Sequence, residues 1–265
     1  MNMFWHELKA NRKSTIIWSV SLIMLAMLYL SLYPSFVKDA EQFTKIMEGY
    51  PEAIRSAIGL NNASFFSILG FYCFPLTFIT LCGAIQAMNL GTAIVSKEVR
   101  EKTADFLLTK PVTRSAVITA KLLAAFVSIL ITNIIYFLAA LVIAEQVKND
   151  DFSLKIFFML SLTLLFIQLI FLAIGFIVSV LFQKIRSVLT VSLATVFAFY
   201  FLGMLSDTSG ENAKRFISPF KYFDTAYIMK HSSYEGEFLL AGGIIIIVAV
   251  AMSYVIYAKK DIHTV

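Results

Sequence analysis

Charged residues are scarce in this chain, at 15% of 265 residues, whereas an ordinary soluble domain carries roughly 25%. Hydrophobic residues make up 59% of the sequence, and the mean hydropathy is +0.80. This composition excludes a soluble globular enzyme. It also excludes a disordered chain, because 25 Phe and 11 Tyr supply ample apolar surface for packing.

Residues that build catalytic and metal sites are equally few. Cys73 and Cys82 are the only cysteines, and nine positions along a helix would separate them by about 13 Å, too far for a disulfide. The three histidines, His6, His231 and His263, are scattered along the chain. The sequence contains no G-x-S-x-G motif and no G-x-x-x-x-G-K-[ST] phosphate-binding loop. We therefore expect no catalytic residue, metal or cofactor in this chain.

Long intervals without charge dominate what remains. A helix needs about 20 mostly apolar residues to cross a hydrocarbon core of about 30 Å. Six segments meet this requirement, at residues 15–33, 65–95, 116–144, 156–182, 187–206 and 238–258. The sequence predicts an all-α, polytopic membrane protein in which residues 1–265 form a single transmembrane domain.

Lysine and arginine are distributed unequally over the connecting segments, and short cytoplasmic loops retain positive charge. With the N-terminus inside, the inner segments carry 13 basic and 5 acidic residues, a net charge of +8, and the outer segments carry 9 basic and 12 acidic residues, a net charge of −3. Both termini are then cytoplasmic, and the chain is a multi-pass protein of the cell membrane. The asymmetry accounts for the overall charge of +5 without a nucleic-acid partner.

Aromatic and basic residues alternate in residues 2–13, where Phe4, Trp5 and Leu8 stand among Lys9, Arg12 and Lys13. This pattern predicts a short helix in the inner membrane interface, with its aromatic rings at headgroup depth. An anchor in the lipid bilayer is the simplest role for such a helix.

An amphipathic segment connects the second and third spans. Ser96 is a candidate N-cap, and the helix must end near Lys110 because Pro111 disfavours helix in its predecessor. One face is apolar and the flanking faces carry both signs of charge. The apolar face comprises Val99, Thr103, Phe106 and Leu107. This pattern fits insertion into a groove on a protein partner, and it equally fits a loop whose apolar side lies on the membrane.

Small and polar residues inside the spans have expected packing roles. Gly83, Ala87 and Gly91 recur every four positions on the second span and predict close helix packing. The strongly polar residues at depth are expected to form hydrogen bonds between helices. They are Gln86, Asn89, Asn133 and Gln168.

The segment from Glu98 to Thr103, Glu-Val-Arg-Glu-Lys-Thr, is followed by Phe-Leu-Leu-Thr-Lys-Pro-Val-Thr ending in Arg114, and then by Lys121. This order resembles the coupling region of the permease subunits of type-2 ATP-binding-cassette exporters, although Lys102 stands where the family has glycine. The stretch 218–223, Ser-Pro-Phe-Lys-Tyr-Phe, resembles an external segment of the same family. The resemblance assigns ATPase coupling to Glu98, Val99, Thr103, Phe106, Leu107, Pro111 and Arg114.

The resemblance implies an exporter permease, of prokaryotic type, that pairs with a second copy or a paralogue. A cytoplasmic ATP-binding subunit would hold ATP and Mg²⁺ and hydrolyse the nucleotide. The cargo would be amphipathic, such as a peptide antibiotic, a drug or a lipid-like molecule, as in multidrug or peptide resistance. Two alternatives are an ion-coupled secondary transporter and a membrane scaffold or sensor. The spans lack the carboxylates that ion coupling usually uses.

Overall fold

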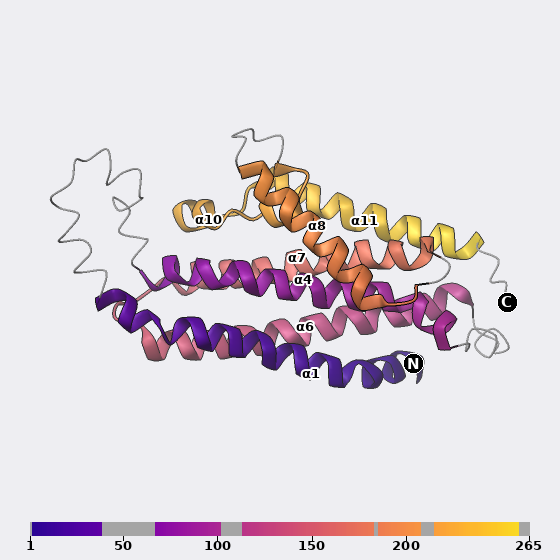
Figure 1. The fold of residues 1–265 in the computed structure, drawn as a ribbon, viewed down its shortest axis with the longest axis horizontal. Coiled ribbons are helices and arrows are strands. Elements are labelled where there is room, and N and C mark those ends of the chain that lie inside the picture. Colours follow the sequence, from indigo (N-terminus) through magenta and orange to yellow (C-terminus); the bar gives the residue numbers. More distant parts are fainter. Residues whose placement is uncertain (1, 39–66, 102–112, 183–184, 208–214, 260–265) are drawn as a thin grey trace.

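The computed structural model describes residues 2–38, 67–101, 113–182, 185–207 and 215–259. These residues form an all-helical protein with no strand in the described ranges (Figure 1). Six of its helices are long and apolar enough to cross a membrane. They are α1 (Asn2–Leu30), α4 (Ile68–Glu101), α6 (Arg114–Val147), α7 (Leu154–Leu181), α8 (Val188–Asp207) and α11 (Gly236–Lys259). The prediction of an all-α membrane protein with six spans is confirmed.

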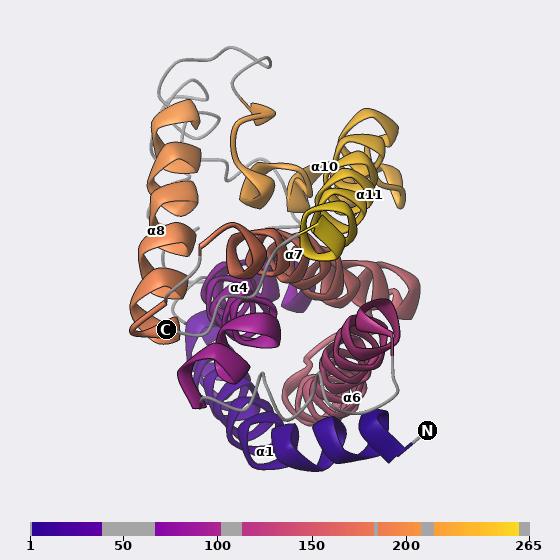
Figure 2. The ribbon, with the colours of Figure 1, turned by 90° about the vertical axis from the view of Figure 1, so that its right-hand side faces the viewer.

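Helix α1 joins two segments that the sequence analysis separates. The predicted interfacial helix at 2–13 and the first span lie in one continuous helix. Figure 2 shows the N-terminal turns of α1 lying across the end of the bundle, on the side of α6. No proline or glycine interrupts residues 2–30, so the helix continues through the polar residues into the apolar span.

The bundle is organised around the contact between α4 and α7. Helices α1, α4, α6 and α7 surround a common axis, and α8 and α11 lie on the opposite side of α7 and α4 (Figure 2). The share of residues buried inside the molecule is 56% for the apolar part of α4 and 61% for that of α7. It falls to 22% for α8 and 17% for α11. The outer faces of α8 and α11 therefore remain apolar and exposed. Leu189, Phe201 and Leu205 of α8 and Leu240, Ile244 and Ile247 of α11 lie on these faces.

Between α8 and α11 the chain folds back against the bundle through η2 (Pro219–Lys221) and α10 (Thr225–His231). Tyr222 and Phe223 are buried, and the Phe223 ring stacks on Phe166 of α7 with centroids 5.3 Å apart. The Tyr222 hydroxyl donates to the Phe216 carbonyl at 2.7 Å, and burial raises the pKa of this phenol. The chain between α8 and α11 thus contains two short helices, and part of it belongs to the core.

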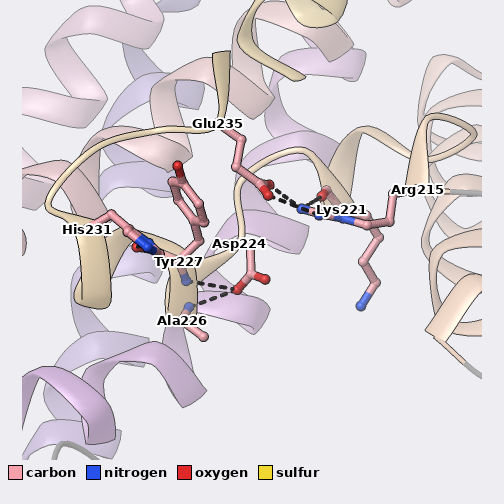
Figure 3. A network of polar contacts seen from close by, with 7 residues as sticks. All are labelled: Arg215, Lys221, Asp224, Ala226, Tyr227, His231 and Glu235. Carbon is pink, nitrogen blue, oxygen red and sulfur yellow. Dashed lines mark hydrogen bonds and ion pairs between the residues drawn. The ribbon is translucent and has the colours of Figure 1, made fainter. Parts of the chain in front are cut away.

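Two side chains fix this region (Figure 3). Asp224 caps α10, its Oδ1 accepting hydrogen bonds from the backbone N–H groups of Ala226 at 2.8 Å and Tyr227 at 3.4 Å. Arg215 forms a two-point ion pair with Glu235 and also donates to the carbonyl oxygen of Lys221 at 3.2 Å. Arg215 thereby ties the chain after α8 to the start of α11.

Candidate functional site

The predicted coupling segment lies between α4 and α6. The apolar span of α4 ends at Ser96, and the helix continues to Glu101. Helix α6 begins at Arg114, with the Thr113 hydroxyl capping it by accepting the Ala116 N–H at 3.3 Å. The backbones of Glu98 and Val99 belong to the end of α4. Among the remaining predicted coupling residues, Thr103, Phe106, Leu107 and Pro111 lie outside the described residues.

The predicted N-cap at Ser96 is wrong. Helix α4 does not break there, and the Ser96 hydroxyl instead donates to the carbonyl oxygen of Thr92 at 2.5 Å, one turn earlier in the same helix. Serine can bond back to its own helix in this way without ending it. The segment that leaves the second span therefore starts as a continuation of that helix rather than as a new helix.

Lys121 of α6 is the central side chain at this end of the bundle. Only 5% of it is exposed, and its Nζ donates to the carbonyl oxygen of Ile94 in α4 at 3.0 Å. The same Nζ lies 3.7 Å from Oε1 of Glu7, which is 15% exposed. One ammonium group thus joins α6, the cytoplasmic end expected for α4, and the N-terminal turns of α1.

This arrangement holds both ends of the α4–α6 connection. Ile94 precedes Ser96 by two residues, and Lys121 follows Arg114 by seven, about two helical turns. The sequence analysis includes Lys121 at the end of the coupling pattern but misses its pairing with Glu7. A signal exists in the sequence, because a buried lysine needs a partner and Glu7 is the only acidic residue in residues 2–30.

A hydrogen-bonded network crosses the middle of the bundle. Gln168 of α7 donates to Gln86 of α4 at 3.1 Å and accepts from Asn133 of α6 at 2.5 Å. Gln86 in turn donates to Thr132 of α6 at 3.0 Å, and Ser19 of α1 donates to the same hydroxyl at 3.4 Å. The expected hydrogen bonding between helices is confirmed for these three amides. The Asn89 side chain is half-buried and forms no hydrogen bond with any described residue.

The small residues of α4 face α7 at very short range. A Cβ atom built on Gly91 would lie 2.4 Å from the carbonyl oxygen of Leu172 and 2.9 Å from the Phe176 nitrogen. A Cβ on Gly175 of α7 would meet the Met88 carbonyl oxygen at 2.6 Å. At Gly83 the nearest atom is instead a side-chain carbon of Leu164, at 2.3 Å. Backbone therefore meets backbone at the Gly91–Gly175 crossing.

These features define a polytopic membrane protein with tightly joined helices, and the described residues contain no cluster of His, Cys, Asp and Glu suited to a metal. The model of the family described as "ABC-2 family transporter protein" matches residues 1–262. The chain belongs to this family, whose permeases are transport subunits of the membrane that generally work with an ATP-binding subunit and are not themselves catalytic. No curated protein matches the sequence.

Proposed function

We propose that this chain is the permease subunit of an ATP-driven exporter in the cell membrane of a prokaryote. In this proposal two permeases form a dimer, and a cytoplasmic ATP-binding subunit docks on residues 96–114 of each. The family assignment supports the ATP-binding partner. The observation that carries the docking position is the Lys121 junction, which anchors both ends of the connection between α4 and α6.

The packing offers a route from this connection to the spans. A displacement of residues 96–114 acts on α4 directly, because α4 is continuous through Ser96. Lys121 passes the same displacement to α6 and α1. Helix α7 follows because its backbone lies against α4 at Gly91 and Gly175. We infer that closure of the ATPase tilts these four helices together, which would switch the transport path between the two sides of the membrane.

The character of the spans favours an amphipathic or hydrophobic cargo. Residues 68–96 of α4 and 188–205 of α8 contain no Asp, Glu, Lys or Arg. Aromatic side chains are exposed on both helices, including Phe74 on α4 and Phe201 on α8. Such surfaces offer apolar contact and no fixed charge for an ionic cargo. The same lack of deep carboxylates weighs against the ion-coupled alternative.

Phe106→Asp tests the proposal. If Phe106 enters a desolvated groove on the ATPase, the new carboxylate abolishes docking, since an uncompensated buried charge costs several kcal/mol. The measurement is co-purification of the co-expressed ATP-binding subunit, followed by hydrolysis stimulated by a panel of amphipathic drugs and peptides. Phe43→Asp, on the opposite side in the predicted topology, is the matched control.

The expected result is loss of the partner and of stimulated hydrolysis for Phe106→Asp alone, with unchanged membrane insertion of both variants. Retention of the partner by Phe106→Asp, at the level of the Phe43→Asp control, would remove the coupling role and return weight to the scaffold and ion-coupled alternatives. If the ATP-binding subunit stays bound but no amphipathic compound stimulates its ATP hydrolysis, the proposed amphipathic cargo would be contradicted.

A further inference from the structure

The N-terminal turns of α1 carry their charges on two different sides. Glu7 is directed into the protein, where its carboxylate pairs with Lys121. Lys9, Arg12 and Lys13 are exposed. Two positions along a helix differ in direction by about 200°, so Lys9 points almost opposite to Glu7. The single acidic residue of this helix is therefore withdrawn from the surface that the basic residues occupy.

The three cations form one patch, which we call the basic face of α1. Lys9, Arg12 and Lys13 stand three and four positions apart and so lie on one side of the helix. None of the three forms an ion pair with a described residue. Trp5, one turn before Lys9, is 52% exposed beside them. The basic face thus combines unpaired positive charge with an aromatic ring at the end of a membrane-spanning helix.

An apolar stripe continues the basic face along the same side of α1. Its residues are large and exposed, and they lead from the charged end toward the middle of the span. They are Ile16, Ile17, Val20 and Met24. Because α1 contacts α4 and α6 with its other side, this stripe faces away from the described helices.

We propose that the basic face of α1 binds anionic phospholipid in the leaflet at which α1 begins. The phosphate of the headgroup would contact Lys9, Arg12 and Lys13, and the acyl chains would lie along Ile16, Val20 and Met24. Anionic phospholipid complements both surfaces, because its headgroup is negatively charged and its acyl chains are apolar, whereas a soluble anion would use only the charged one. Trp5 marks headgroup depth, where indole rings concentrate.

Glu7 has a specific part in this site. A carboxylate left on the surface next to Lys9 would neutralise one of three cations and repel an anionic headgroup. Its burial against Lys121 leaves the face with a net charge of three. The same contact fixes the rotation of the helix, so the junction that holds the α4–α6 connection also sets the direction of the basic face. The proposal does not depend on the ATPase or on the cargo.

Tryptophan fluorescence provides the test, because the chain has only two tryptophans, Trp5 and Trp18. The full-length protein carrying Trp18→Phe reports on Trp5 alone. It is reconstituted in nanodiscs that contain either brominated phosphatidylglycerol or brominated phosphatidylcholine at equal fraction, with the bromine near the ester end of the chain. Contact with a brominated lipid quenches the indole, so the two quenching curves give the relative affinity at this position.

We expect phosphatidylglycerol to be favoured about fivefold or more, the factor that roughly one basic group near an anionic surface contributes. The variant with Lys9→Gln, Arg12→Gln and Lys13→Gln should lose the preference, and Lys9→Arg with Lys13→Arg should keep it. The control, Lys148→Gln with Lys155→Gln at the other end of the bundle, should leave it unchanged.

Equal quenching by the two lipids in the Trp18→Phe protein, with its basic face intact, would overturn the proposal. This comparison does not depend on whether the triple variant folds. The absence of quenching by both lipids would also overturn the proposal, because Trp5 would then lie outside the membrane. Retention of the preference in the triple variant, or its loss in the Lys148 and Lys155 control, would show that general membrane charge rather than the basic face selects the lipid.

Discussion

The Nζ atom of Lys121 donates a 3.0 Å hydrogen bond to the carbonyl oxygen of Ile94, although the two residues are 27 positions apart. Between them lies the whole α4–α6 connection. The contact closes this connection at its base, and Glu7 approaches the same ammonium from α1. The buried ammonium thus has a carbonyl oxygen on one side and a carboxylate on the other. Substitutions of Lys121 and of Glu7 should therefore lower the stability of the protein by different amounts.

Lys121→Met should destabilise the protein more than Glu7→Gln. The first change removes the hydrogen bond to the Ile94 carbonyl, worth about 1.5–3 kcal/mol, together with the ion pair, whereas the second removes only the ion pair and leaves an amide oxygen that can still accept from Lys121. Thermal unfolding in detergent micelles measures both. The exchanged variant, Glu7→Lys with Lys121→Glu, should stay destabilised, because the carboxylate at 121 would face the Ile94 carbonyl. Recovery of parental stability in that variant would mean that the Ile94 contact is unimportant.

Composition alone allowed the six spans to be predicted. The hydrocarbon core excludes charge, so intervals such as 65–95 stand out from the sequence, and the helix found there starts at Ile68. The end of that helix could not be predicted. Ser96 is a good N-cap residue, but its hydroxyl has an equally local alternative in the Thr92 carbonyl. Only the surrounding structure decides between the two hydrogen bonds.

Contacts between distant segments were the other missing part. The sequence marks Lys121 as a lysine that needs a partner and offers Glu7 as one candidate, but the pairing itself depends on α1 lying across the end of the bundle (Figure 2). Similarly, Phe223 reads as part of an external segment, yet it stacks on Phe166, 57 residues earlier. Apolar residues next to a membrane span can be buried by lipid or by protein, and periodicity does not distinguish the two.

Substitutions at the glycines should follow the kind of atom that a new Cβ meets. Gly91→Ala should cost about 1–3 kcal/mol, the usual range for overpacking, because the Leu172 carbonyl and the Phe176 nitrogen are backbone atoms that cannot move away. Gly83→Ala should cost less, since the Leu164 side chain can change its rotamer. Gly243→Ala in α11 is the control, with no atom within 4 Å. Thermal denaturation that ranked Gly83→Ala as the most damaging of the three would contradict the crossing.

The amide network should couple its members only weakly. Hydrogen bonds between membrane helices average about 0.6 kcal/mol in double-mutant cycles. We therefore expect a coupling energy of about that size between Asn133→Leu and Gln168→Leu, whose side chains share a hydrogen bond. Gln168 also donates to Gln86, whereas Asn133 bonds one side chain of another described helix, so the loss of Asn133 alone should be the milder change. Strictly additive effects on unfolding would mean that the two amides act independently.

The charge asymmetry predicts which loops are reached from outside. In a chain with Cys73→Ala and Cys82→Ala, single cysteines at Lys148 and Lys45 should react with a membrane-impermeant thiol reagent in intact cells. Cysteines at Lys9, Glu101 and Thr264 should react only after the membrane is opened. External labelling of position 101 would place the coupling segment on the wrong side and defeat the proposed ATPase docking.

Arg215→Lys should loosen the end of the bundle at which α11 begins, even though the charge is kept. The guanidinium pairs with both oxygens of Glu235, donates to the Lys221 carbonyl and lies 4.2 Å from the Phe238 ring centre. One ammonium cannot reproduce this planar, three-sided contact, so we expect a loss of about 1–2 kcal/mol in the free energy of unfolding.

The matched control is Lys148→Arg, at an ion pair whose acidic partners, Glu145 and Asp151, are exposed, and it should change nothing measurable. Hydrogen exchange of residues 216–235 should rise in Arg215→Lys alone. If exchange there matched the parent, the segment would be held by the stacking of Phe223 on Phe166, and the ion pair would be dispensable.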